Sequence, residues 1–83
     1  MGTQSSSMHD LVVWLAQQLV DDKGAVKVDT IDSDRSAVFE LTVHPDDLGR
    51  VIGRGGRTAK AIRSVLDAAA RKEGRRAVLD ILD

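Results

Sequence analysis

The chain contains no cysteine, no tyrosine and only two aromatic residues, Trp14 and Phe39. Without cysteine it can form no disulfide, no thiolate zinc site and no thiol nucleophile, and it is compatible with a reducing compartment. The shortage of aromatic rings argues against modules that read nucleic acid by stacking bases on exposed aromatic side chains. Apolar runs of about 20 residues are also missing, so we expect no membrane span and a cytoplasmic location.

The sequence also has little that suggests catalysis. His9 and His44 are the only histidines, and neither has a ligand-spaced partner or a convincing nucleophile. The acid pairs at 21–22 and 46–47 are explained by the end of one helix and the start of another, which makes a metal site the weaker alternative. We therefore expect a protein that is not an enzyme and that has no metal, no cofactor and no small-molecule substrate.

Positive charge is concentrated in one segment. The 83 residues are enough for one domain with one modest core, and their net charge is −1. Between Leu48 and Leu66, however, there is no Asp or Glu. The five cations of this segment are Arg50, Arg54, Arg57, Lys60 and Arg63. A basic block of this kind attracts backbone phosphates without sequence preference.

Three glycines, Gly53, Gly55 and Gly56, lie inside the basic block. Glycine permits left-handed dihedrals and lets another molecule approach the backbone closely. The apolar residues that follow recur at three- and four-residue spacing, as on one face of a helix: Ala59, Ile62, Val65, Leu66, Ala69 and Ala70. The turn therefore lies at a helix N-terminus, where free amides and the helix dipole favour an anion, typically a phosphate.

Other phosphate-binding motifs do not fit this turn. A dinucleotide-binding fingerprint would need glycine at position 58, where the chain has Thr58. A Walker A loop would need glycine at position 51 and lysine at position 57, where Val51 and Arg57 stand. A plain tight turn followed by a solvated helix face remains possible, but ordinary exposed helices mix acids with bases and this one does not.

The rest of the chain alternates helix and strand patterns. We expect a disordered tail over residues 1–7. An apolar stripe then predicts a helix over about 8–21. Trp14 lies on this helix but off the stripe, and its favoured role is packing at the edge of the core, with base stacking as the alternative. Alternating residues predict a hairpin of strands at 25–31 and 37–43.

The second half should contain two helices and one strand. Pro45 predicts the start of a short helix over about 45–51, the long helix begins at about Arg57 and closes near 71–74, and a largely apolar strand follows at 77–82. The order is α-β-β-α-α-β. Because the last strand returns after a two-helix crossover, it can lie parallel to the second. We expect an α+β fold with a mixed three-stranded sheet and helices packed on one face.

The segment from Val51 to Gly56, Val-Ile-Gly-Arg-Gly-Gly, followed by a basic amphipathic helix, closely resembles the I-G-x-x-G core of the KH domain. KH domains bind single-stranded nucleic acid, and their Gly-x-x-Gly loop clamps about four nucleotides. Length, element order and residues 48–70 are similar to the KhpA group of small bacterial KH proteins. The resemblance implies a type II KH domain over residues 8–83.

The resemblance also implies a set of RNA-binding residues. The loop from Gly53 to Gly56 would contact phosphates, and Val51 and Ile52 would help to form an apolar floor for bases. The neighbouring cations would extend the positive field, and Thr30, Val38 and the second strand would supply contacts from the sheet edge. The complete implied set on and around the loop is Arg50, Val51, Ile52, Gly53, Arg54, Gly55, Gly56, Arg57, Lys60 and Arg63.

By the same resemblance the chain would be an RNA chaperone or post-transcriptional regulator linked to cell elongation and wall synthesis. One KH groove spans few nucleotides, so we expect added avidity from a homodimer or from a complex with a KhpB-like KH protein. Two alternatives stay open. The domain could be a protein-interaction or dimerisation module with its loop buried in the interface, or it could bind single-stranded DNA through the same groove.

Overall fold

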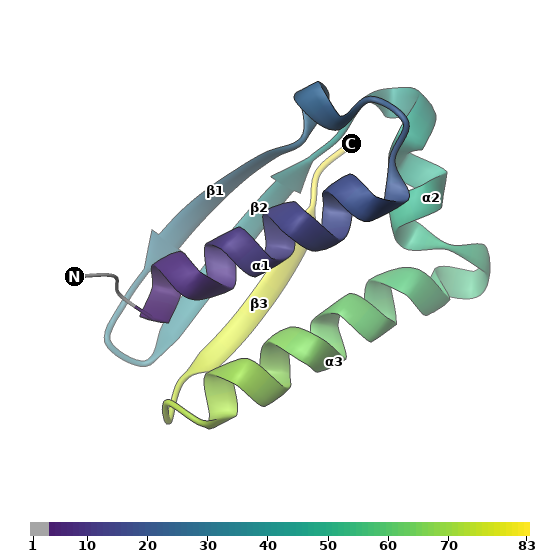
Figure 1. Cartoon of the computed structure of the whole chain (residues 1–83). Coiled ribbons are helices and arrows are strands. Elements are labelled where there is room, and N and C mark those ends of the chain that lie inside the picture. The colour runs from purple at the N-terminus through teal and green to yellow at the C-terminus, as the bar shows by residue number, and fades with distance from the viewer. Residues whose placement is uncertain (1–3) are drawn as a thin grey trace.

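Helices lie against one face of a three-stranded sheet in the computed structural model, which describes residues 4–83 (Figure 1). Three short 3-10 turns join the main elements at Lys23–Ala25, Pro45–Asp47 and Arg54–Gly56. No helix among the described residues is long and apolar enough to cross a membrane. The helices and strands are, in chain order, α1 (Gln4–Leu19), β1 (Lys27–Asp32), β2 (Ser36–Thr42), α2 (Leu48–Ile52), α3 (Arg57–Arg71) and β3 (Arg76–Ile81).

The sheet is mixed, with β2 in the centre. β1 pairs with β2 antiparallel and places Thr30 opposite Phe39, and β3 pairs with β2 parallel and places Leu79 on the other side of Phe39. The antiparallel pair needs only a tight turn, whereas the parallel pair needs the long crossover that α2 and α3 provide. The predicted α+β architecture, its α-β-β-α-α-β order and its mixed sheet are confirmed.

The core lies between the central strand and the helices. Alternate residues of β2, namely Ala37, Phe39 and Leu41, have no solvent-exposed surface. From α1 they are covered by Met8, Val12 and Ala16, and Val20 continues this four-residue spacing directly after the helix. From α3 they are covered by Ile62, Leu66 and Ala70. These positions follow the predicted stripes, because helix period and strand alternation decide which side chains can face the sheet.

Boundaries differ from the predicted ones by a few residues. α1 begins at Gln4, so residues 4–7 of the predicted disordered tail are helical. No glycine or proline interrupts the helix there. Residues 1–3 lie outside the described residues. At the other end, the Lys23 ammonium donates to the carbonyl oxygens of Gln17 at 2.7 Å and Val20 at 3.2 Å. These bonds satisfy carbonyls at the end of the helix, which stops at Leu19 rather than at residue 21.

A buried carboxylate ties the start of α2 to the end of α1. Asp47 is only 3 % exposed, and its two oxygens accept the backbone N–H groups of Asp21 at 3.2 Å and Asp22 at 3.1 Å. The N–H of Asp22 contributes most to lowering the pKa of Asp47; burial opposes this, and the N–H of Asp21 and the charge of Arg50 lower it further. The sequence suggested only a helix-dipole role for this acid, whereas the fold uses it as a clamp.

We predict that Asp47→Asn lowers the melting temperature at neutral pH, because an amide offers one acceptor to two N–H donors and no charge to Arg50. A lowered folded-state pKa contributes stability above the ordinary value of 3.8, and this stability is lost as the pH falls through the lowered pKa. The difference in melting temperature between the variant and the parent chain should therefore be steady between about pH 5 and pH 7 and shrink below about pH 4. Thermal unfolding followed by circular dichroism measures it.

The matched control is Asp46→Asn, which changes the exposed neighbouring carboxylate by the same chemistry. Its melting temperature should stay close to that of the parent chain across this range. Equal losses from both substitutions would contradict the assignment of Asp47 as the clamp.

Candidate nucleic-acid interface

The glycine turn joins α2 to α3 at one end of the molecule (Figure 1). Gly53 caps α2, and its N–H donates to the carbonyl of Gly49 at 2.8 Å. Gly53, Gly55 and Gly56 have φ values of 78°, 64° and 79°, which residues with a side chain rarely adopt. Within the described residues, the N–H groups of Arg54 and Gly55 make no hydrogen bond. The loop therefore presents free backbone donors at the start of a long helix, as an anion site requires.

The three glycines serve different purposes. A Cβ added at Gly53 would lie 2.7 Å from the Cβ of Thr58 and 2.8 Å from its backbone nitrogen, so the side chain must be absent for α3 to turn back against the loop. A Cβ at Gly55 or Gly56 would meet nothing within 4 Å. At these two positions glycine supplies the backbone conformation and leaves the outer surface of the loop open to a ligand.

Three of the five predicted cations are free. Arg54, Arg57 and Lys60 are exposed, and none forms an ion pair with another residue of the range 4–83. They lie on the loop and on the first turn of α3, around the free N–H groups. Their charges therefore combine with the helix dipole to make this end of the molecule attractive to phosphates.

The other two predicted cations are partly engaged within the fold. Arg50 lies 3.2 Å from the carboxylate of Asp21 and 3.4 Å from that of Asp47, so its charge is balanced locally. Arg63 donates from Nη2 to the backbone carbonyl of Leu79 on β3 at 3.3 Å. The sequence could not indicate the contacts with Leu79 and Asp21, because Leu79 lies 16 residues from Arg63 and Asp21 lies in the segment after α1, far from Arg50 in the chain. Only Asp47, three residues before Arg50, is a local partner.

The two apolar residues before the loop differ in exposure. Val51 is fully buried, whereas Ile52 is 37 % exposed. The predicted apolar floor is therefore corrected: Val51 supports the loop from the core, and only Ile52 offers surface to a base. The cause is the helical path of α2, in which neighbouring residues point about 100° apart.

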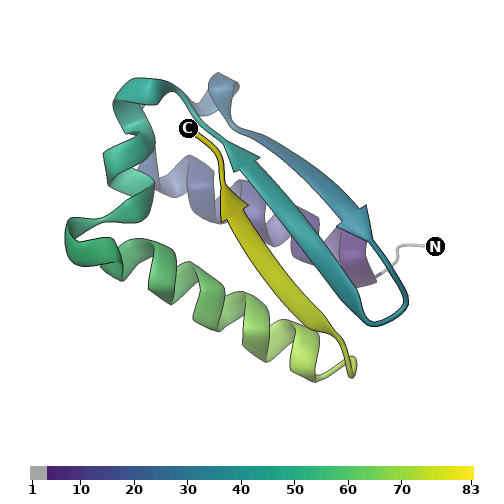
Figure 2. The same ribbon diagram turned by 180° about the vertical axis from the view of Figure 1, so that it is seen from behind.

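The sheet edge next to α3 belongs to β3, not to the strands of the hairpin (Figure 2). Arg76 and Leu82 donate their N–H groups to β2, at the carbonyls of Arg35 and Leu41. By alternation, Ala77, Leu79 and Ile81 direct their backbone groups to the outer edge. The expected sheet-edge contacts from Thr30 and Val38 do not lie at this edge, since β2 is the central strand and β1 forms the opposite edge. Sequence reasoning missed the β3 edge because backbone groups leave no residue signature.

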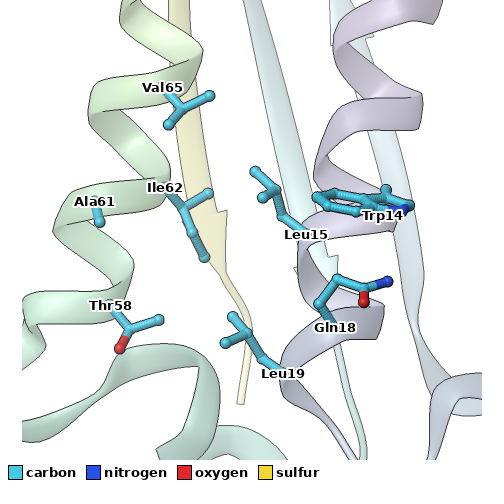
Figure 3. Close-up of a pocket in the computed structure, with 8 residues that line it drawn as sticks. All are labelled: Trp14, Leu15, Gln18, Leu19, Thr58, Ala61, Ile62 and Val65. Carbon is cyan, nitrogen blue, oxygen red and sulfur yellow. The ribbon is translucent and has the colours of Figure 1, made fainter.

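An apolar groove separates α1 from α3 beside the loop (Figure 3). It has a volume of about 280 Å³ and ends at Thr58, close to the glycine turn. Trp14 lies on the rim of this groove and is 57 % exposed. It therefore lies at the edge of the core, as predicted, but its side chain is not buried there. Val65, predicted for the buried face of α3, is 44 % exposed on the other wall. The residues lining the groove are Trp14, Leu15, Gln18, Leu19, Thr58, Ala61, Ile62 and Val65.

We predict that Gly53→Ala lowers the free energy of unfolding by about 2 to 3 kcal/mol, because the strain of a positive φ adds to the displacement of Thr58. Gly55→Ala meets the milder strain of the left-handed helical region and open space, and should cost only about 1 kcal/mol. Urea unfolding of both variants measures the difference. Equal losses would show that the close approach of Thr58 is not a constraint.

Comparison with known proteins agrees with this geometry. The model of the family described as KhpA/KhpB, KH domain, matches residues 9–81. The chain is 54 % identical over 76 residues to the RNA-binding protein KhpA of Halalkalibacterium halodurans, covering 92 % of this chain and all of that protein. It is 46 % identical over 78 residues to the RNA-binding protein KhpA of Aquifex aeolicus, covering 94 % of this chain and 99 % of that protein.

A mycobacterial relative extends the comparison. The chain is 44 % identical over 79 residues to the RNA-binding protein KhpA of Mycobacterium tuberculosis, covering 95 % of each chain. No solved structure matches the chain. Because the family model covers most of the domain and these relatives match along nearly their whole length, the chain belongs to the KhpA/KhpB family of KH-domain proteins.

Proposed function

We propose that the chain binds single-stranded RNA through the loop from Gly53 to Gly56. The observation that carries this proposal is the combination of free backbone N–H groups, glycines open to solvent and three unpaired cations at the start of α3. Phosphates would accept hydrogen bonds from the loop, while Arg54, Arg57 and Lys60 would add electrostatic attraction. The relatives named RNA-binding protein KhpA support the choice of RNA.

Bases would lie between the loop and the edge of β3. Ile52 offers apolar surface on one side, and the outward backbone groups of β3 offer hydrogen bonds on the other. Arg63 contacts that edge at Leu79 and retains further donors for a phosphate or a base. The chemistry required is recognition alone, so we propose a binding protein and not an enzyme.

The cellular role follows from the family rather than from the geometry. We propose an RNA chaperone or post-transcriptional regulator that acts in the cytoplasm, with a link to cell elongation and wall synthesis. The family description pairs KhpA with KhpB, which supports a KhpB-like KH protein as a partner. A second RNA-binding domain would raise the avidity of a groove that holds only a few nucleotides.

Self-association is the second candidate activity, and the groove between α1 and α3 favours it. Trp14 and Val65 expose much of their side chains there, and small residues such as Ala61 allow close approach of another helix. A contiguous apolar surface on a small protein is typical of an interaction site. We propose that a second copy packs on this groove by a two-fold arrangement and leaves the loop accessible.

To test RNA binding, we predict that Arg54→Asp/Gly55→Asp weakens binding to short single-stranded RNA at least about tenfold, because negative charge replaces a phosphate contact. Asp tolerates the positive φ of position 55 better than most residues, so the flanking helices should persist. Fluorescence anisotropy at several salt concentrations measures the affinity. If three or four phosphates are engaged, log affinity of the parent chain should fall with log salt at a slope of about −2 to −3.

The control is Arg71→Asp/Lys72→Ser, which makes the same change in charge at the far end of α3. It should leave RNA affinity nearly unchanged. Equal weakening by both variants would contradict binding at the loop. Equal affinity for single-stranded DNA would instead indicate a groove without preference for RNA, and lost assembly with intact RNA affinity would favour the interaction-module alternative.

To test self-association, we predict that Val65→Asp shifts the protein from dimer to monomer in sedimentation equilibrium, because it places a charge in the apolar groove. RNA long enough to reach two domains should then bind about tenfold more weakly, while short RNA binds as before. The matched control is Ser64→Asp, at the exposed residue directly before Val65 on the same helix, and this variant should remain dimeric. A monomeric parent chain would reject the proposal.

A further inference from the structure

The sheet has a second face that α1 and α3 do not cover. In Figure 1, α1 lies in front of the sheet, and in Figure 2, turned by 180°, the sheet lies in front of α1. The residues on this open face alternate with the buried ones along each strand, so their identities follow from the strand register. The open face is distinct from the loop, the β3 edge and the α1–α3 groove.

Two rows of contrasting chemistry cross the open face. Ile31, Val38 and Val78 are paired across the three strands and form an apolar row, in which Ile31 is 57 % and Val78 42 % exposed. Two residues along, a second set is paired in the same way and forms an acidic row: Asp29, Glu40 and Asp80. We call these two rows together the open-face strip.

The acidic row is an unfavourable arrangement for the isolated domain. Strands lie about 4.8 Å apart, so each carboxylate directly faces another of the same charge, and like charges at opposite positions destabilise a sheet. None of the three forms an ion pair with another residue of the range 4–83. Lys27 lies two residues from Asp29 on the same face but makes no ion pair with it either. A cationic ligand would relieve this repulsion, and the adjacent apolar row would give it surface to bury.

We propose that the open-face strip docks a basic amphipathic segment of another protein, one that presents lysine or arginine beside aliphatic side chains. Each row spans about 10 Å across three strands, which matches two turns of a helix, and the rows lie about 7 Å apart. RNA and anionic membranes are disfavoured, because the carboxylates repel phosphate groups. A second copy is disfavoured, since its free cations at positions 54, 57 and 60 belong to the loop region that is proposed to bind RNA.

This proposal does not depend on RNA binding. The loop and its cations lie at the α2–α3 junction, whereas the open-face strip lies on the side of the sheet away from α1. The two surfaces have opposite charge, so a cationic segment and an RNA strand would bind different parts of the domain and could bind together. The domain would then connect a basic protein to RNA.

The test uses the whole chain and a synthetic amphipathic helical peptide of leucine and lysine as the probe, with a scrambled peptide of the same composition beside it. Chemical shifts of the ¹⁵N-labelled protein should change in β1, β2 and β3 and not in the loop. Asp29→Asn/Glu40→Gln/Asp80→Asn should reduce affinity for the probe at least about tenfold. Asp34→Asn/Asp67→Asn/Asp83→Asn removes three exposed acids elsewhere and should leave affinity within about twofold of the parent chain.

The apolar row is tested separately with Ile31→Ser/Val78→Thr. This variant should also bind the peptide probe more weakly, and its melting temperature should lie within a few degrees of that of the parent chain. Equal affinity for the scrambled peptide, equal effects of the two acid variants, or shift changes centred on the loop or the α1–α3 groove would each overturn the proposal. Self-association through the strip, detected as a loss of dimer in the Asp29/Glu40/Asp80 variant, would also overturn it by assigning the surface to a second copy.

Discussion

The close approach of Thr58 to Gly53 is the constraint on which the candidate interface depends. α3 can turn back directly after the loop only because position 53 carries no side chain and adopts a positive φ. That turn places the first amides of α3 beside the free N–H groups of the loop, and it directs Arg54, Arg57 and Lys60 outward. Any Cβ at position 53 would force the helix away and separate these groups.

Interactions elsewhere hold the other half of this arrangement. Asp47 clamps the segment that follows α1, and Arg50 pairs with both Asp47 and Asp21, so the short helix α2 is fixed although five residues cannot form a stable helix alone. Arg63 joins α3 to the edge of β3. One cation of the basic block thus serves mainly to position the loop, and another links the loop's helix to the sheet.

Charge is distributed over the folded domain in a way that the near-zero net charge hides. Free cations gather at the α2–α3 junction, while unpaired carboxylates are aligned across the open face of the sheet. An apolar groove with Trp14 and Val65 lies between α1 and α3. A small domain therefore presents three chemically different surfaces, as the proposed binding of RNA and of other macromolecules would require.

The sequence by itself determined the order of elements, most of the buried positions and the glycine loop, because these depend on local periodicity and on the conformations that glycine and proline permit. It also located the basic block, since the absence of acids between Leu48 and Leu66 is visible without a structure. The tertiary structure alone decided that Val51 is buried and Ile52 exposed, that Arg50 is neutralised by Asp21, and that β3 provides the edge beside α3. It likewise aligned Asp29, Glu40 and Asp80, because strand register brings together residues that no local pattern relates.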